Sequence, residues 1–209
     1  MTTRPYDSAL RLRKQAELKA RIIDAAAALH AQKGATDTSY ADIASHAGVS
    51  LPTVYAHFPT QRDLLAGCTA HVGARAPALP IEQILASTDL PSAAELLAAA
   101  MDARHHHFEP WLAWREDRVI PFLAELSGAR RDQFAALIAR VLRRHLGPGD
   151  HREAVAAWES TLSFDFWHRL THGHRLSRPR VRRIVVRSLL AIASPQRDLA
   201  VQPTLRRKR

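Results

Sequence analysis

Residues 48–58 read GVSLPTVYAHF, and this stretch decides the fold. Gly48 suits the left-handed backbone conformation in which many helices end. Ser50, two residues later, can accept a hydrogen bond from a free amide at the start of the next helix, and Pro52 is tolerated in the first turn. The stretch therefore predicts a tight turn at Gly48 followed by a short helix over residues 50–57.

Helix-start signals lie on both sides of this turn. Ser39 and Asp42 have the spacing of a capping box, in which a hydroxyl and an acid three residues later accept hydrogen bonds from free backbone amides. Thr60 and Asp63 repeat the pattern. The first of these helices would end at Gly48. A helix, a turn and a second helix in this order form a helix-turn-helix, whose second helix enters the major groove of DNA.

The rest of the chain also has a helical pattern. Apolar residues recur at helical spacing, and no alternating strand pattern of useful length is present. The pattern predicts helices at residues 92–110, 111–127, 129–146, 150–173 and 177–194, with lengths suited to an antiparallel bundle. The sequence therefore predicts an all-α fold.

Composition narrows the class of protein. The chain has 209 residues, of which 46% are apolar and 24% charged, and no apolar run is long enough to span a bilayer. The first residues contain no apolar segment typical of an export signal. The single cysteine, Cys68, excludes an intramolecular disulfide framework and a cysteine-based zinc site. We therefore expect a cytoplasmic protein with no membrane partner.

The net charge of +10 favours a polyanionic partner, but it does not locate a site. The excess is spread along the chain, in a basic N-terminal arm, in the final RRKR and in an arginine run. That run is either a solvated helix face or a functional surface, and it contains Arg175, Arg178, Arg180, Arg182, Arg183 and Arg187. The arm either follows the DNA backbone or enters the minor groove, or else it is a disordered basic tail. It contains Arg4, Arg11, Arg13, Lys14, Lys19 and Arg21.

Residues 18–65 resemble the DNA-binding domain of the tetracycline-repressor (TetR) family of bacterial regulators. The resemblance rests on Ile22, Ala26, Gly34, Thr38, Ser39, Ile43, Ala44, residues 47–50, residues 53–55, His57, Phe58 and Leu64. It implies an all-helical homodimer with an N-terminal three-helix DNA-binding domain and a C-terminal domain for ligand binding and dimerisation. It also implies a repressor that leaves a double-stranded DNA operator when a small molecule binds.

These expectations divide the chain into four parts. Residues 1–15 form a flexible basic arm, and residues 16–66 form the helix-turn-helix domain. Residues 67–194 form the helical ligand-binding and dimerisation domain, and residues 195–209 form a flexible basic tail.

The helix over residues 50–57 supplies most of the expected DNA contacts. Its N-terminal residues face base edges, and Val54 and Phe58 pack inward. The resemblance assigns contacts with backbone phosphate to Tyr55 and His57, although Tyr55 is alternatively a packed aromatic residue. The full set expected to contact DNA is Thr38, Ser39, Ser50, Leu51, Pro52, Thr53, Tyr55, His57, Gln61 and Arg62. Gln61 stands where the family usually has lysine, and Arg62 is expected to compensate for the missing charge.

Aromatic residues beyond the helix-turn-helix suggest a ligand pocket, since such pockets combine apolar walls with a few polar groups. The alternative is that these residues belong to the core. The expected ligand-binding residues are Arg104, His107, Trp111, Trp114, Arg115 and Trp167. No cofactor is expected.

The last two long helices are expected to pair with those of a second copy, because dimer symmetry would match a palindromic operator. The alternative is that they only close the core of one chain. The expected interface residues are Trp158, Leu162, Phe166, Val185, Leu189 and Ile192.

An enzyme or a metal-binding protein is the remote alternative. His105, His106 and His107 are consecutive, so on a helix their side chains point about 100° apart and cannot meet at one ion. His168 and His172 share a helix face and could ligate a metal together with Asp102, Glu109 or Asp165. No glycine-rich phosphate loop or known catalytic motif is present. We expect no catalysis and no metal, and a regulator controlled by a protein partner remains the other alternative.

Overall fold

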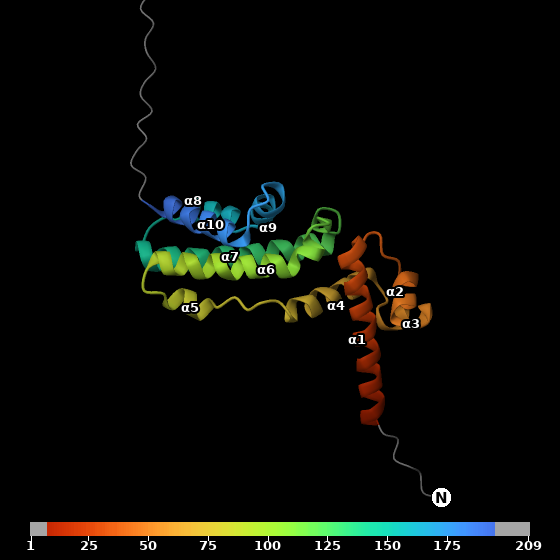
Figure 1. The fold of residues 1–209 in the computed structure, drawn as a ribbon. Coiled ribbons are helices and arrows are strands. Elements are labelled where there is room, and N and C mark those ends of the chain that lie inside the picture. The colour runs from red at the N-terminus through yellow and green to blue at the C-terminus, as the bar shows by residue number, and fades with distance from the viewer. Residues whose placement is uncertain (1–7, 195–209) are drawn as a thin grey trace, which may run out of the picture. The chain divides into compact units, whose positions relative to one another are not determined.

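The computed structural model describes residues 8–194, which contain helices and no strand (Figure 1). The all-α prediction is therefore confirmed. The described residues contain no helix with both the length and the apolar character to cross a bilayer. The helices are α1 (Ser8–Lys33), α2 (Tyr40–Ala47), α3 (Leu51–His57), α4 (Gln61–Ala74), α5 (Ile81–Ala86), α6 (Leu90–Leu112), α7 (Pro121–Leu146), α8 (Arg152–Thr161), α9 (Phe164–His168) and α10 (Arg178–Ala193), with a 3₁₀ turn at Glu116–Arg118 and a π turn at Arg169–Gly173.

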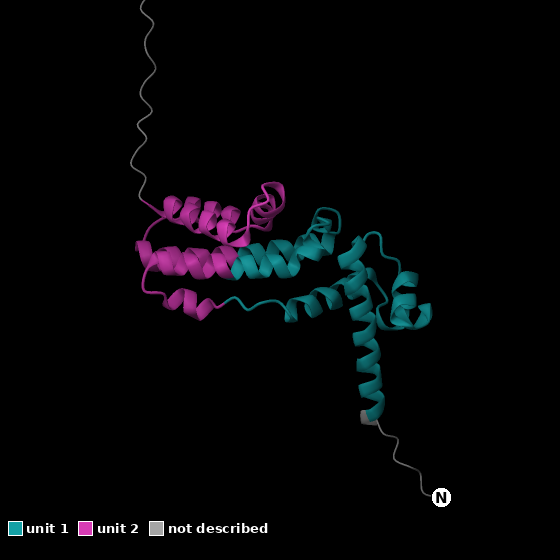
Figure 2. Cartoon of the chain, viewed as in Figure 1, with its two compact units in different colours: residues 1–79, 100–132 teal, residues 80–99, 133–209 magenta. Residues whose placement is uncertain are grey.

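The described chain divides into two compact units that are each discontinuous in sequence (Figure 2). Unit 1 contains the residues up to 79 together with 100–132, and unit 2 contains 80–99 together with the residues from 133 onward. Helices α6 and α7 each contribute one half to each unit (Figure 2). The sequence pattern predicted a single boundary after residue 66, and it gave no sign that residues 100–132 return to the first unit.

The first four helices of unit 1 enclose one apolar core. Ile22 from α1, Ile43 from α2, Val54 from α3 and Leu64 from α4 are each at most 2% exposed. Cys68 lies in the same cluster. Burial raises the pKa of the Cys68 thiol to about 12. This core fixes the mutual position of α2 and α3, which is what a DNA-reading helix requires.

Unit 2 has its own core, made by one face from each of its long helices. α10 buries Val181, Val185, Leu189 and Ala193, which recur every four residues. Trp158 of α8 is completely buried, and its indole Nε1 donates a hydrogen bond to the Leu189 carbonyl at 2.9 Å. The indole therefore joins α8 to α10 by both packing and a hydrogen bond.

Three predicted helix boundaries are wrong, each for a local reason. α1 already begins at Ser8, so residues 8–15 are helical and not a flexible arm, while residues 1–7 and the tail at 195–209 lie outside the described part. α7 is continuous through Gly128, because a single glycine costs a helix only about 1 kcal/mol. A break follows α8, because Ser163 caps a new helix by accepting a hydrogen bond from the Phe166 amide.

Candidate DNA-binding surface

The N-terminal end of α2 is fixed by the capping box that the sequence predicted. Ser39 Oγ accepts a hydrogen bond from the Asp42 amide at 3.1 Å, and the Asp42 carboxylate accepts one from the Ser39 amide at 3.0 Å. Lys33 Nζ, at the end of α1, donates to the same carboxylate at 2.8 Å. The bond from Lys33, together with those from Ser39, lowers the pKa of Asp42 to about 2. Thr38 and Ser39 therefore lie at a helix end that is tied to α1.

The turn between α2 and α3 forms at Gly48, as predicted. Gly48 has φ +64, a left-handed conformation that glycine adopts without steric cost. Arg21 of α1 supports the turn, because its Nη2 donates to the Ala47 carbonyl at 2.6 Å and lies 3.4 Å from the Gly48 carbonyl oxygen. Arg21 therefore satisfies carbonyls at the end of α2 and is not part of a disordered arm.

Replacing Arg21 with glutamine should lower the free energy of unfolding by about 1 kcal/mol, because hydrogen bonds from a charged donor to the end of α2 are lost. Urea denaturation measures the effect. Arg13→Gln is the matched control, since it removes the same charge from an exposed position on the same helix. Equal losses in the two variants would show that charge, and not the bonds to α2, is responsible.

The recognition helix α3 buries one face and exposes the other. Ser50 caps it, with its Oγ accepting from the Thr53 amide at 3.4 Å. Val54 and Phe58 are 0% and 2% exposed, so the prediction that they pack inward is confirmed. Leu51 and Pro52 in the first turn are exposed. The exposed face of α3 therefore begins at the helix end where free amides and the helix dipole favour a negative ligand.

The hydroxyl of Thr53 already takes part in a local hydrogen bond. Its Oγ1 lies 2.7 Å from Ser50 Oγ, so the two hydroxyls share a hydrogen bond across the first turn of α3. The side chain of Thr53 remains partly exposed. A contact with a base edge or a thymine methyl is compatible with this arrangement.

Tyr55 has an aromatic partner that the sequence did not predict. The ring of Tyr55 packs on the ring of Tyr40, with centroids 4.7 Å apart and planes inclined by 39°. Tyr55 remains 51% exposed, so it is both a packed aromatic residue and an accessible one. No pattern in the sequence links position 40 to position 55, because the contact depends on how α2 crosses α3.

Gln61 and Arg62 at the start of α4 behave differently. Gln61 is exposed beside α3, and Thr60 caps the helix through a box with Asp63. Arg62 Nη2 instead donates to the Glu125 carboxylate at 3.0 Å, and its guanidinium lies 4.8 Å from the centre of the Phe122 ring. In this DNA-free structure α7 provides Arg62 with both an acid and an aromatic ring, and the expectation that Arg62 replaces the charge missing at Gln61 stays a prediction.

Four residues expected to line a ligand pocket instead bind backbone carbonyls within unit 1. Trp111 Nε1 donates to the Ala27 carbonyl at 2.9 Å, and Trp114 Nε1 donates to the Ala31 carbonyl at 3.2 Å. The two tryptophans therefore tie the end of α6 to α1. The other two bonds run from Arg104 Nη1 to the Pro77 carbonyl at 2.7 Å and between His107 Nε2 and the Val72 carbonyl at 3.0 Å.

The segment after α6 continues this contact with α1. The Glu116 carboxylate accepts a hydrogen bond from the Thr36 amide at 2.6 Å. A Cβ atom at Gly34, which has φ +80, would lie 2.8 Å from that carboxylate. Position 34 therefore requires glycine both for its backbone conformation and for the approach of Glu116.

The remaining two expected ligand residues are Arg115 and Trp167. Arg115 adopts φ 57 at the start of the 3₁₀ turn. Trp167 belongs to unit 2, where it is 4% exposed and its ring lies 5.8 Å from that of Phe164.

Four of the six expected interface residues are core residues of a single chain. Trp158, Leu162, Val185 and Leu189 are at most 7% exposed within unit 2, so they are not available to a partner. The regular spacing of these residues made them candidates for both roles, and the packing of α10 on α8 selects the core. Phe166 and Ile192 remain partly exposed.

The three consecutive histidines lie in different surroundings. His105 is 7% exposed, His106 is exposed, and His107 binds the Val72 carbonyl. In unit 2, the rings of His168 and His172 stack with centroids 4.5 Å apart. The triplet therefore diverges as the helix geometry predicted.

Comparison with known proteins gives the same picture of the fold. SmeT in complex with triclosan has a TM-score of 0.63 and 17% identity, over 84% of this chain and 90% of that one. A transcriptional regulator from Rhodococcus sp. Rha1 has a TM-score of 0.61 and 19% identity, over 83% and 95%. The multidrug binding protein EbrR in complex with imidazole has a TM-score of 0.53 and 23% identity, over 82% and 89%. The comparison with curated proteins found no match.

The capped α2, the turn at Gly48 and the half-exposed α3 define a helix-turn-helix DNA-binding domain of a transcriptional regulator. Residues 22–68 match the family described as bacterial regulatory proteins, tetR family. These residues therefore contain a DNA-binding domain of the tetR-family type.

Proposed function

We propose that this protein is a repressor that binds a palindromic DNA operator as a homodimer and leaves it when a small molecule binds. The observation that supports it most is α3. Its N-terminal turn exposes Leu51 and Pro52 while Val54 and Phe58 hold the opposite face in the core. A short helix fixed in this way can enter a major groove without rearranging.

The proposed contacts with DNA divide into two kinds. Leu51, Pro52 and Thr53 face the base edges, and they determine which sequence is bound. The remaining proposed contacts are with the DNA phosphate backbone, and they position the protein on the duplex. They are Thr38, Ser39, Ser50, Tyr55, His57 and Gln61. Free amides at the N-terminal ends of helices are donors to phosphate oxygens, and α3 contains no acidic residue.

A homodimer explains how a single short helix would reach useful specificity, because two copies read two half-sites. We place the interface on the outer faces of α8 and α10, next to the partly exposed Phe166 and Ile192. Sedimentation should show a dimer at micromolar concentration, and a monomer there would contradict this part of the proposal.

The same fold holds triclosan in SmeT and imidazole in EbrR, and this supports a small-molecule effector for this chain. Trp111 and Trp114 bind α1 through hydrogen bonds, and these contacts would transmit a movement of α6 to the DNA-binding helices. An effector acts only if it favours the form with misplaced recognition helices, since a ligand with equal affinity for both forms shifts nothing.

Selection from random duplexes, followed by fluorescence anisotropy on the selected sequence, tests the function as a whole. The proposal requires enrichment of a palindrome and an affinity that falls steeply as salt concentration rises. A selection without sequence preference would overturn it.

Replacing Gln61 with lysine should strengthen operator binding several-fold and steepen the dependence of log affinity on log salt concentration by about 0.9 per half-site, because one more phosphate is neutralised in each. Titrations between about 50 and 200 mM salt measure the slope. Gln83→Lys is the control, since it adds the same charge at an exposed position on α5. Equal changes in both variants would place position 61 away from the DNA.

A further inference from the structure

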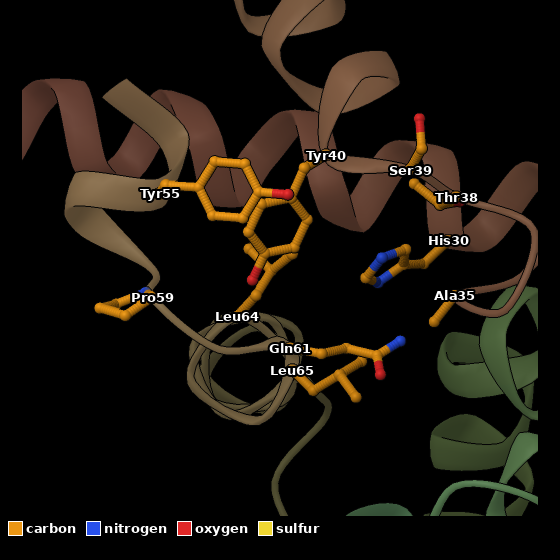
Figure 3. Close-up of a pocket in the computed structure, with 10 residues that line it drawn as sticks. All are labelled: His30, Ala35, Thr38, Ser39, Tyr40, Tyr55, Pro59, Gln61, Leu64 and Leu65. Atoms are coloured by element: carbon orange, nitrogen blue, oxygen red, sulfur yellow. The ribbon is translucent and has the colours of Figure 1, made fainter. Parts of the chain in front are cut away.

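A pocket of about 320 Å³ lies within the DNA-binding domain (Figure 3). It is formed by the loop between α1 and α2, by Tyr40 and Tyr55, and by the first turns of α4. Its size is at the lower end of the range of small-molecule sites. The sequence analysis predicted no pocket here, since it placed ligand binding beyond residue 67.

One buried polar side chain points into this pocket. His30 of α1 is 5% exposed, and its ring faces the space between Ser39 and Gln61 (Figure 3). No hydrogen bond joins the His30 ring to another residue among 8–194, and its nitrogens are not among the fully buried unpaired atoms, so they are open to an occupant of the pocket. Burial lowers the pKa of His30, with the nearby charge of Glu116 acting in the opposite direction. The uncharged ring offers one acceptor and one donor.

A second polar group beside the pocket also lacks a partner. The Tyr40 hydroxyl is fully buried and makes no hydrogen bond among residues 8–194. It lies near Leu64 (Figure 3). An occupant that reaches this hydroxyl could bond to it, and no bond of the hydroxyl would have to break first.

The residues that line the pocket indicate which class of molecule it can bind. Two tyrosine rings and the side chains of Leu64, Leu65 and Ala35 supply flat apolar surface. The lining contains no lysine or arginine, and the charges that act on His30 and Tyr40 include those of the acids Glu116 and Asp63. An anion is therefore disfavoured, whereas an aromatic ring with one hydroxyl or ring nitrogen is matched by both the walls and the imidazole.

We propose that this pocket binds an uncharged planar aromatic molecule of one or two rings, which hydrogen-bonds to His30 and competes directly with DNA. The competition rests on the proposed function, because Thr38, Ser39, Tyr55 and Gln61 form the rim of the pocket and are also proposed contacts with DNA. Such a molecule would occupy the DNA-binding surface itself, and it would act without any change passing through α6.

The test of binding uses 2-naphthol and the full-length protein without DNA. Titration followed by NMR of the leucine methyl groups should shift the resonances of Leu64 and Leu65 and saturate at submillimolar to millimolar concentration. The anionic analogue 6-hydroxynaphthalene-2-sulfonate should bind at least about tenfold more weakly, because the acids oppose its charge. Unchanged Leu64 and Leu65 resonances with millimolar 2-naphthol would overturn the proposal, and so would equal affinity for the two compounds.

Variants distinguish binding of 2-naphthol in this pocket from nonspecific binding to apolar surface. His30→Phe keeps a planar ring but removes both nitrogens, and it should weaken 2-naphthol about tenfold. Gln61→Trp places a bulky ring at the exposed rim, where folding is unaffected, and it should also weaken binding. His46→Phe is the control, because His46 is exposed on α2 and lies outside the pocket. Wild-type affinity in both pocket variants would overturn the assignment.

Tyr40→Phe should raise the melting temperature by about 2–4 °C, because it removes a buried hydroxyl that has no partner. The same change should reduce the affinity for 2-naphthol. Scanning calorimetry and the methyl titration measure the two effects. A lower melting temperature would mean that the hydroxyl is paired in the folded protein, and it would remove this group from the proposed site.

The competition is measured separately with the selected operator. 2-Naphthol should raise the apparent Kd for DNA in proportion to its occupancy of the pocket, and His30→Phe should reduce this effect. If the methyl groups shift but the operator affinity stays constant, the competition is overturned while the binding site stands. Failure of the protein to bind DNA without 2-naphthol would instead contradict the proposed function.

Discussion

Replacing Leu51 with glutamate should lower operator affinity about 100-fold or more while leaving the protein at least as stable as the wild type. Leu51 is the first residue of α3 and is 39% exposed, so a longer polar side chain is accommodated there. A negative charge at the start of a helix interacts favourably with the helix dipole and should stabilise α3 slightly. Opposite a phosphate backbone, the same charge is repelled, and close like charges cost several kcal/mol.

The separation of folding from binding makes this variant informative. Leu51→Gln has nearly the same size without the charge, and it should retain most of the affinity. Thermal denaturation checks stability, and anisotropy at low salt measures binding. If the glutamate variant binds the operator within about threefold of the wild type, α3 does not face DNA through its first turn.

Replacing Trp158 with alanine should lower the free energy of unfolding by about 3–5 kcal/mol, which is a large share of the stability of a typical domain. The change leaves a cavity in the core of unit 2, and it leaves the Leu189 carbonyl without the indole donor. Chemical denaturation monitored by circular dichroism measures the loss.

Two further variants divide this loss into its causes. Trp158→Phe keeps most of the apolar volume but removes the N–H group, so it should cost distinctly less than alanine. Trp114→Ala truncates an indole that is 44% exposed, and it should cost less than Trp158→Ala. A stable, folded monomer from Trp158→Ala would instead support the interface role that the sequence suggested for this residue.

The helix-turn-helix was predictable because its signals are local. A cap requires only a hydroxyl, an acid and a spacing of three residues, and the capping boxes at Ser39 and Thr60 form as predicted. Gly48 ends α2 for an equally local reason, since few other residues adopt its backbone conformation.

The contacts between distant segments were not predictable in the same way. An indole N–H needs an acceptor, but nothing in the sequence says that Trp111 finds it on Ala27, 84 residues earlier. For the same reason, core residues of α8 and α10 were wrongly predicted to lie in a dimer interface. A stripe of large apolar residues at helical spacing predicts burial, but it does not say whether the same chain or a second copy provides the covering surface.

Cys68 has a practical consequence for measuring the motions proposed above. It is the single cysteine of the chain, it lies 95% buried in the helix-turn-helix core, and its thiol stays protonated at neutral pH. Maleimides react with thiolates, so the native protein should leave this position unlabelled. A cysteine introduced at exposed Ala56 on α3 would then be the only reactive one. Spin or fluorescent labels at that position would report the spacing of the two recognition helices directly, without first removing a native residue.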